Sequence, residues 1–300
     1  MKQLLNCCLL MGIFFSNTYA QDTVITSQNN AALKTEDSVR SFAPEKSVQQ
    51  IPQTSVYHIK WKVDGPVLAA GFGLSAVGLS LIQNKDDLTQ EELATKTKDD
   101  IPFFDRGNAG YYDENANDAS YIPFFAAFGM PVAVLLVDKT ERNQAGKILV
   151  MYTEALAITS SMYTLSAGLI DRSRPLVYGG EEVPLEKKLS NNSQRSFYAG
   201  HVAASACASF YAAKVYSDLH PDSKFRTYLW IVSAAVPAVT AYYRYQAGQH
   251  FLSDCILGYA LGASTGILVP QLHKIKNFDR VSIYPATWPK AKGLGVAYRF

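Results

Sequence analysis

Six long apolar stretches dominate the chain between residues 66 and 273. None of them alternates apolar and polar residues over the length of a β-strand, and Ala, Leu, Ile and Tyr are frequent. Short or medium polar segments separate them, so consecutive helices are expected to run antiparallel. The sequence therefore predicts an all-α fold, a six-helix up-and-down bundle, with helices over 66–82, 121–137, 146–170, 198–216, 225–244 and 251–273.

The two ends of the chain differ from this helical region. The chain begins with the pattern of a secretory signal peptide: Lys2, an apolar run over 4–15, and small residues up to Ala20, with an uncleaved membrane anchor as the alternative. A segment rich in Ser, Thr, Gln and Asn follows. These patterns divide the chain into a signal peptide (1–20), a mostly disordered leader (21–60), a helical domain (61–276) and a tail with a short β hairpin (277–300).

Composition gives no reason to expect a nucleic-acid-binding protein, and it leaves open whether the chain spans a membrane. Hydrophobic residues make up 48% of the chain, and the net charge of +2 gives no reason to expect a nucleic-acid partner. The six stretches are long enough to span a membrane, but the mean hydropathy is only −0.03 and Glu154 lies in the third stretch. An exported helical globule, periplasmic or in the cell envelope, is therefore preferred, and an integral membrane protein is the alternative. No feature indicates an oligomeric state.

Charged and imidazole side chains gather in three short stretches at predicted helix ends. One closes the third helix, one opens the fourth, and one joins the fifth to the sixth, so an antiparallel bundle brings all three to one end. Arginine guanidinium groups bind tetrahedral oxyanions through paired hydrogen bonds, and helix N-terminal amides add donors and a favourable dipole. The sequence therefore predicts an anion pocket with two imidazoles. Its residues come from Arg172-Ser173-Arg174-Pro175, from Gly200-His201, and from Arg244, His250 and Asp254.

The order and spacing of these motifs resemble a known family. The family pattern is Lys-x6-Arg-Pro, then Pro-Ser-Gly-His, then Ser-Arg-x5-His-x3-Asp. This chain has Arg174-Pro175, Gly200-His201 and Arg244-x5-His250-x3-Asp254. It is similar in this respect to the type 2 phosphatidic acid phosphatase superfamily, which includes bacterial non-specific acid phosphatases and vanadium haloperoxidases. The resemblance covers about residues 121–273 and implies the helical bundle of that superfamily.

The resemblance implies a role for each motif residue. His250 would attack phosphorus and form a phosphohistidine, while Asp254 would hold the other nitrogen of that imidazole. His201 would protonate the leaving oxygen and then activate water. The groups that would bind the phosphate are Arg174, Arg244 and the amide of Gly200. This scheme needs no metal and no other cofactor; vanadate would be bound only by a haloperoxidase.

The chain departs from the family pattern at phosphate-binding positions. The place of the family Lys, seven residues before Arg174, is Ala167, and the Ser before Gly-His is Ala199. Losing one donor to a transition-state oxyanion costs on the order of 3 kcal/mol. Arg172 is the first candidate to replace the lost charge, with a solvent-facing side chain as the alternative, and Arg195 is a weaker candidate.

Three functions follow from these observations. The preferred one is a phosphatase that hydrolyses phosphate monoesters or diphosphates, with lipid phosphates or related envelope substrates as the expected partners. A vanadate-dependent haloperoxidase is the second. The third is a catalytically impaired member of the family that acts as an envelope protein.

Overall fold

The computed structural model describes residues 55–275 apart from residue 138, and the backbone of residues 281–288 and 291–298. The predicted signal peptide and nearly all of the predicted leader lie outside the described residues. The domain boundaries given above therefore stay predictions. In the tail, strand β1 (Val281–Trp288) pairs antiparallel with strand β2 (Ala291–Tyr298).

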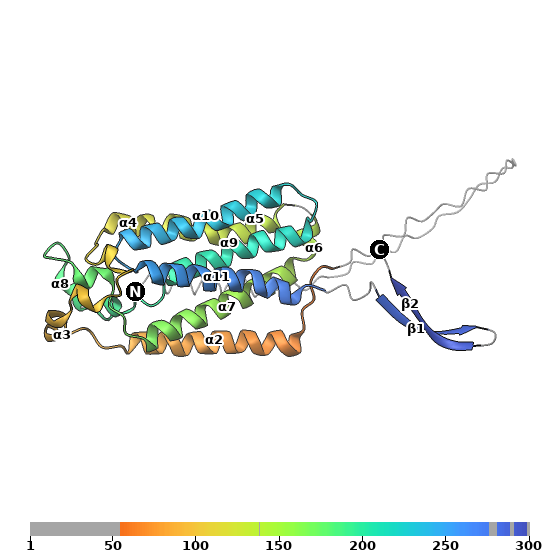
Figure 1. Ribbon diagram of the computed structural model, residues 1–300, viewed down its shortest axis with the longest axis horizontal. Coiled ribbons are helices and arrows are strands. Elements are labelled where there is room, and N and C mark those ends of the chain that lie inside the picture. The colour runs from red at the N-terminus through yellow and green to blue at the C-terminus, as the bar shows by residue number, and fades with distance from the viewer. Residues whose placement is uncertain (1–54, 138, 276–280, 289–290, 299–300) are drawn as a thin grey trace, which may run out of the picture. The chain divides into compact units, whose positions relative to one another are not determined.

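The described helical region is a bundle of long helices that lie side by side along one direction (Figure 1). The long helices are α2 (Trp61–Gln83), α5 (Tyr121–Leu135), α7 (Ala145–Leu169), α9 (Gly200–Leu219), α10 (Phe225–Gln246) and α11 (Leu252–His273). The shorter ones are α3 (Gln90–Thr95), α4 (Glu114–Ala119), α6 (Lys139–Asn143) and α8 (Leu185–Leu189). The prediction of an all-α fold built on six long helices is confirmed, with helix ends that differ from the predicted ones by a few residues.

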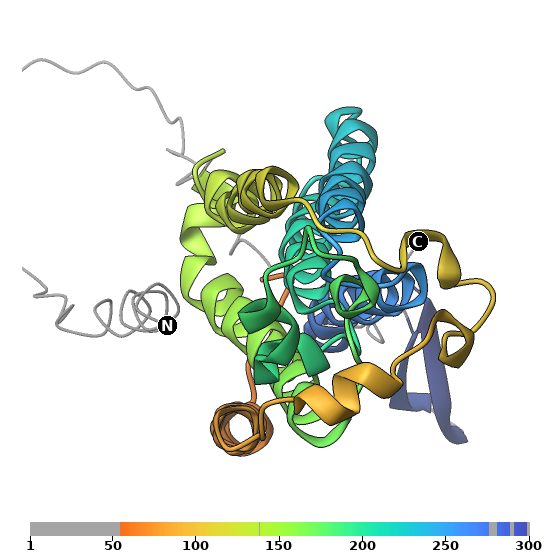
Figure 2. The same cartoon turned by 90° about the vertical axis from the view of Figure 1, so that its left-hand side faces the viewer.

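Helix α9 forms the centre of the bundle. It packs against α5, α7, α10 and α11, which surround it in the end-on view (Figure 2). Most of its side chains are small, and buried residues occupy every side of the helix between Val202 and Tyr216. Helix α2 packs against α7 at the edge of the bundle.

A row of glycines lets α11 approach α9 closely. Glycine recurs at every fourth residue on one face of α11, and a Cβ at Gly262 would lie only 2.0 Å from the carbonyl oxygen of Ala203. The contact continues to the start of both helices, where the Ala199 amide donates to the carbonyl of Asp254 at 3.1 Å. Tight packing of these two helices thus brings two of the three predicted motifs together.

The bundle has two different ends. Helix α7 ends, α9 begins, α10 ends and α11 begins at the end that also carries α3 and α8 (Figure 1). We call this the loop end. Helix α2 begins and α11 ends at the opposite end, which we call the far end. There Tyr57 forms a β-bridge with Lys274.

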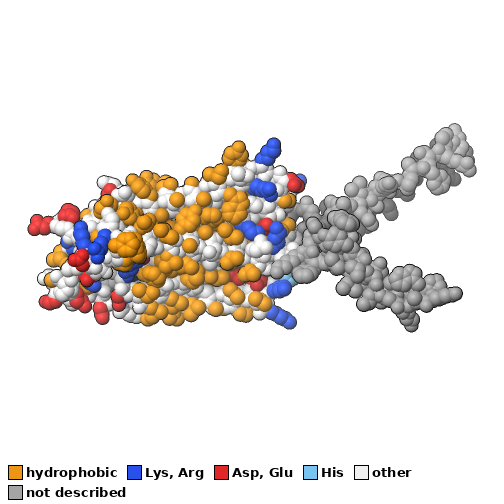
Figure 3. Space-filling view, in the orientation of Figure 1, with side chains coloured by type: hydrophobic (Ala, Val, Ile, Leu, Met, Phe, Trp, Pro, Cys, Tyr) orange, Lys and Arg blue, Asp and Glu red, His pale blue; other side chains and the backbone are white. Residues whose placement is uncertain are grey.

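Apolar side chains cover the middle of the bundle surface between these ends. Figure 3 shows them as a broad band, with charged side chains gathered towards both ends. Val77 of α2, Ile231 of α10 and Ile256 of α11 are each more than half exposed. Among the described residues, four stretches are long and apolar enough to cross a membrane: α2, α4 with α5 (Glu114–Leu135), α7 and α11. The bundle therefore fits association with a membrane, while the exported location stays a prediction.

Candidate active site

The loop after α7 pairs with the loop before α9 at the loop end. The amide of Arg172 donates to the carbonyl of Gln194 at 3.1 Å, and the amide of Arg174 donates to the carbonyl of Ser193 at 2.7 Å. This pairing brings Arg174 close enough to Arg195 for an electrostatic interaction. Two loops that are separate in the sequence thus form one wall of the site.

The loop between α10 and α11 carries His250. It turns at Gly248, which has a φ of +66° and no room for a side chain, because a Cβ there would lie 1.8 Å from the carbonyl oxygen of Tyr111. The side-chain amide of Asn108 donates to the carbonyl of His250 at 3.0 Å. The buried imidazole donates from Nδ1 to the carbonyl of Ser196 at 2.7 Å. A carbonyl only accepts, so Nδ1 carries the proton and Nε2 is left with a free lone pair.

Asp254 does not hold His250, which corrects the expected role. Its carboxylate accepts hydrogen bonds from the guanidinium of Arg172, from the hydroxyl of Ser196 at 2.6 Å and from the amide of Phe251 at 3.1 Å. The physical reason is its place in the first turn of α11, where the carboxylate caps the helix, while the Ser196 carbonyl takes Nδ1 of the imidazole. Asp254 therefore fixes Ser196, and the Ser196 carbonyl orients His250.

Arg172 does not replace the missing lysine, a second correction. Its guanidinium pairs with the buried carboxylates of Asp105, at 2.6 Å, and Asp254, and lies 4.8 Å from the ring centre of Phe251. Two buried carboxylates need a cation close by, because an unpaired buried charge is strongly destabilising. Arg172 supplies that cation, so it is neither solvent-facing nor free to bind phosphate.

Three other arginines have buried nitrogen atoms that lack a partner. The Nε atoms of Arg174, Arg195 and Arg244 are buried, and no described residue accepts a hydrogen bond from them. Leaving one such donor unpaired costs about 1–3 kcal/mol, so three together indicate a ligand that accepts hydrogen bonds. Oε1 of Gln249 accepts from both Arg174 and Arg244 through other guanidinium nitrogens, which places one oxygen between them. We call these three residues the arginine cradle.

Tyr163 of α7 lies at the centre of the arginine cradle. It interacts electrostatically with all three guanidinium groups. A Cβ at Gly200 would lie 2.5 Å from its ring, so the first residue of α9 packs directly on it. The Gly200 amide is in the first turn and therefore has no acceptor within its own helix. Tyr163 also lies one turn before Ala167, on the same face of α7 that would carry the family Lys.

His201 lies beside the arginine cradle. It is the second residue of α9, and its ring centre is 4.7 Å from that of Phe124. Arg174 and Arg244 interact electrostatically with both His201 and His250, and the two imidazoles interact with each other. The structure thus brings both histidines to one site, although they come from different helices.

Burial and the charge of the arginine cradle together set the protonation of the site. Burial first, and then Arg174 and Arg244, hold the pKa of His250 well below its usual value of 6.5. Burial and the neighbouring guanidinium groups lower the pKa of Arg174 to about 9, so this residue stays a cation at neutral pH. The arrangement can bind an oxyanion and present a neutral imidazole nitrogen to its central atom, with a second imidazole available for proton transfer.

Most of the predicted site residues lie together, and some residues without an assigned role lie with them. The structure brings together His250, His201, Arg174, Arg244 and Gly200, while Arg172 and Asp254 form an ion pair next to them. Ser196, Gln249 and Tyr163 had been given no role. Ser196 and Gln249 are next to motif residues in the sequence, but no motif marks Tyr163, because its position depends on how α7 packs against α9.

One family model matches the part of the chain that carries the three motifs. The family model of the PAP2 superfamily matches residues 148–278, from the first turn of α7 to beyond the end of α11. This segment therefore matches the superfamily that the motifs of the chain resemble.

Curated proteins and solved structures add little to the match with the family model. No curated protein matches the chain. One similar solved structure is the crystal structure of the first transmembrane PAP2 type phosphatidylglycerolphosphate phosphatase from Bacillus subtilis, which is 16% identical. The match covers 73% of this chain and 100% of that chain, with a TM-score of 0.39. A TM-score this low carries no argument about the function of this chain.

Proposed function

We propose that this chain is a phosphatase that removes phosphate from a lipid phosphate monoester or diphosphate through a phosphohistidine at His250. The observation that carries this proposal is the arginine cradle, in which three buried Nε atoms lack acceptors next to two imidazoles. The match of residues 148–278 to the PAP2 superfamily model supports phosphatase activity as the general class.

The first step forms the phosphohistidine. The bound phosphate anion lets His201 take up a proton from solvent. The Nε2 lone pair of His250 then attacks phosphorus while the bond from phosphorus to the leaving oxygen breaks, and protonated His201 gives its proton to that oxygen. The arginine cradle and the Gly200 amide donate hydrogen bonds to the other phosphate oxygens and stabilise the charge of the transition state. The carbonyl of Ser196 accepts from Nδ1 and thereby stabilises the positive charge that develops on the imidazole.

The second step releases phosphate. Water attacks the phosphohistidine while His201 takes its proton, and the bond between phosphorus and Nε2 breaks. Inorganic phosphate leaves, and His250 regains its lone pair. The cycle consumes only the substrate and water, and it uses no metal ion.

An apolar groove between α10 and α11 supports a lipid as the substrate. Its volume is about 500 Å³, and its walls include Tyr242, Tyr245, Leu252 and Ile256. Tyr245 and Leu252 flank the loop that carries His250, so an acyl chain in the groove would begin next to the phosphate site. A soluble phosphate ester would leave this apolar surface uncovered.

The activity test is a phosphate-release assay on the purified full chain in detergent. A diacylglycerol phosphate and a polyprenyl diphosphate would be compared with a soluble aryl phosphate, using His250→Ala and the matched control His58→Gln, which changes an exposed histidine. We expect turnover of a lipid phosphate, an acid-labile phosphoenzyme and inhibition by vanadate, and a loss of more than about 10³-fold only in His250→Ala.

Each other outcome contradicts the proposal in a different way. Full activity of His250→Ala would exclude the phosphohistidine. Absence of turnover on every ester would favour the catalytically impaired envelope protein. Halide oxidation that depends on vanadate and peroxide would favour the haloperoxidase.

We further propose that the six long helices span the membrane, with the loop end and the far end on opposite sides. The exposed apolar band and the four stretches of spanning length support this arrangement. Cysteines introduced at Glu181 of the loop end and at Asp222 of the far end test it, because both residues are exposed. A maleimide that cannot cross membranes is expected to label only one of them in intact cells, and both after permeabilisation.

Labelling of both positions in intact cells would contradict this topology. The unmodified chain is the control for its native cysteines, of which Cys207 and Cys255 are buried. The signal peptide predicted over 1–20 adds a sharper expectation. It would place the far end outside the cytoplasm, so Asp222→Cys is the variant expected to react first.

A further inference from the structure

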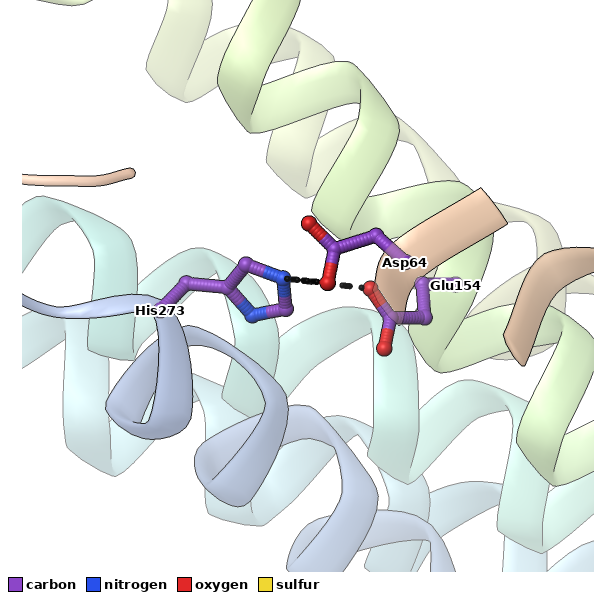
Figure 4. A group of neighbouring side chains, drawn as sticks. All are labelled: Asp64, Glu154 and His273. Atoms are coloured by element: carbon purple, nitrogen blue, oxygen red, sulfur yellow. Dashed lines mark ion pairs between the residues drawn. The ribbon is translucent and has the colours of Figure 1, made fainter. Parts of the chain in front are cut away.

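Three ionisable side chains meet at the far end of the bundle, away from the arginine cradle. Asp64 lies in the first turn of α2, Glu154 lies within α7, and His273 is the last residue of α11 (Figure 4). Nε2 of His273 is 3.3 Å from Oδ1 of Asp64 and 3.3 Å from Oε2 of Glu154. One ligand atom from each of the three residues lies within 4.8 Å of the others. We call these residues the far-end cluster.

Two members of the far-end cluster are oriented by hydrogen bonds from behind. Nδ1 of His273 donates to the carbonyl of Val269 at 2.8 Å, which leaves Nε2 pointing at the carboxylates. Oδ2 of Asp64 accepts the amide of Lys60 at 2.5 Å, which leaves Oδ1 for the cluster. Histidines that bind metals usually donate their other ring nitrogen to a carbonyl or carboxylate in this way.

The side chains of the far-end cluster are buried, and two of the atoms that face one another there lack hydrogen-bond partners. Asp64 and Glu154 are 4% and 6% exposed, and the side chain of His273 is 8% exposed. Neither Oε2 of Glu154 nor Nε2 of His273 has a hydrogen-bond partner among the described residues. Two buried carboxylates carry two negative charges, and a protonated imidazole would neutralise only one of them.

The spacing of these atoms distinguishes a metal site from an ion pair. A charge-assisted hydrogen bond between nitrogen and oxygen measures about 2.7–2.9 Å, shorter than the two separations of 3.3 Å. In a tetrahedral zinc site with bonds of about 2.0–2.1 Å, neighbouring ligand atoms lie about 3.3–3.4 Å apart. Both separations from Nε2 of His273 match the second spacing.

We propose that Asp64, Glu154 and His273 bind a divalent transition-metal ion, with Zn²⁺ as the best match. One imidazole nitrogen and two carboxylate oxygens suit zinc better than calcium or magnesium, which prefer oxygen ligands alone. Three protein ligands leave a fourth position for water. The ion would neutralise both carboxylates and tie α2, which packs on α7 at the edge of the bundle, to the end of α11.

The test uses the purified full chain in detergent, without an affinity tag, after dialysis against a chelator. We expect one Zn²⁺ per chain by elemental analysis, and visible absorption bands of a tetrahedral ion when Co²⁺ is added instead. Zn²⁺ at a hundredfold excess over its Kd should raise the Tm by roughly 5–10 °C.

Glu154→Gln and His273→Gln should each weaken Zn²⁺ binding at least about 100-fold and abolish the Tm rise. His220→Gln is the control, because the imidazole of His220 pairs with Glu141, which is not part of the far-end cluster, and this change should leave Zn²⁺ binding unchanged. A wild-type chain that binds no stoichiometric Zn²⁺ or Co²⁺, with a Tm that does not respond, would overturn the proposal and leave a protonated His273 between two carboxylates. That result would leave the phosphatase proposal unaffected, because that proposal depends on the arginine cradle and the two histidines at the loop end.

Discussion

The two ends of the bundle carry buried polar clusters of opposite charge. At the loop end, the arginine cradle holds three guanidinium groups with unpaired Nε atoms next to two imidazoles. At the far end, the buried carboxylates of Asp64 and Glu154 face one imidazole. Between the ends, the side chains on the surface are largely apolar (Figure 3).

The difference in charge between the two ends shows that unpaired buried groups indicate which kind of ligand a site binds. Burying a donor or acceptor without a partner costs free energy, so a cluster of such groups indicates a partner of the opposite kind. The arginine cradle lacks acceptors and therefore suits an oxyanion. The far-end cluster lacks positive charge and therefore suits a metal cation. Arg172 with Asp254 and Asp105 makes the contrast clear, because each oxygen of these two carboxylates already accepts a hydrogen bond.

The largest effect is expected from Arg195, which would supply the positive charge of the family Lys that is replaced by Ala167. Arg195→Gln should lower kcat/KM for a lipid phosphate by about 10²–10³-fold, because one charged donor to the transition state is lost. Arg195→Lys should recover part of the activity, since it restores the charge without the planar fork. Steady-state kinetics of both variants measure the effect. Equal activity of Arg195→Gln and the wild type would show that the cradle contains only two arginines.

Arg172 should affect stability instead of phosphate binding. Arg172→Gln leaves the buried carboxylates of Asp105 and Asp254 without their cation, which should cost about 3 kcal/mol of unfolding free energy. Thermal unfolding in detergent measures the loss, and KM of the remaining folded enzyme should stay near the wild-type value. A large rise in KM without a change in Tm would show that Arg172 binds the phosphate after all.

Tyr163 should contribute one neutral hydrogen bond to the bound phosphate. Tyr163→Phe removes only the hydroxyl at the centre of the arginine cradle, so kcat/KM should fall about tenfold, as expected for a loss of roughly 1.4 kcal/mol. Tyr152→Phe is the matched control, because Tyr152 lies on the same helix and packs against the hydrophobic core. A similar loss of kcat/KM in both variants would indicate that the changes disturb the packing of α7 and do not act on phosphate binding.

The smallest expected effect concerns pH. The pKa of His250 lies well below 6.5, so its imidazole stays neutral and kcat/KM should remain high as the pH falls through 6.5. Below pH 6.5 the unfolded chain takes up a proton at this residue and the folded chain does not, so stability should decline there. His250→Gln should lack this part of the decline. A wild-type kcat/KM that falls with an apparent pKa of 6.5 or higher would contradict the low pKa.

Several parts of this structure could be predicted from the sequence because they depend on local pattern. Long apolar stretches separated by polar loops define the helices, and the spacing from Arg244 to His250 and Asp254 marks the loop between α10 and α11. Antiparallel packing then requires the motifs to meet at one end. The same reasoning could not choose between Arg172 and Arg195. They form a β-bridge with each other, and which side chain enters the site depends on the contacts of their loops.

The sequence by itself determined the number of long helices, their order and the gathering of His201, His250 and Arg174 at one end of the bundle. Only the tertiary structure decided the partners of the charged groups. Asp254 forms an ion pair with Arg172, and Nδ1 of His250 donates a hydrogen bond to the carbonyl of Ser196. The tertiary structure also joined Asp64, Glu154 and His273 from three helices into one cluster. The reason is physical: helix formation follows local periodicity, whereas the pairing of buried charges depends on which side chains the packing of distant segments brings within a few ångströms.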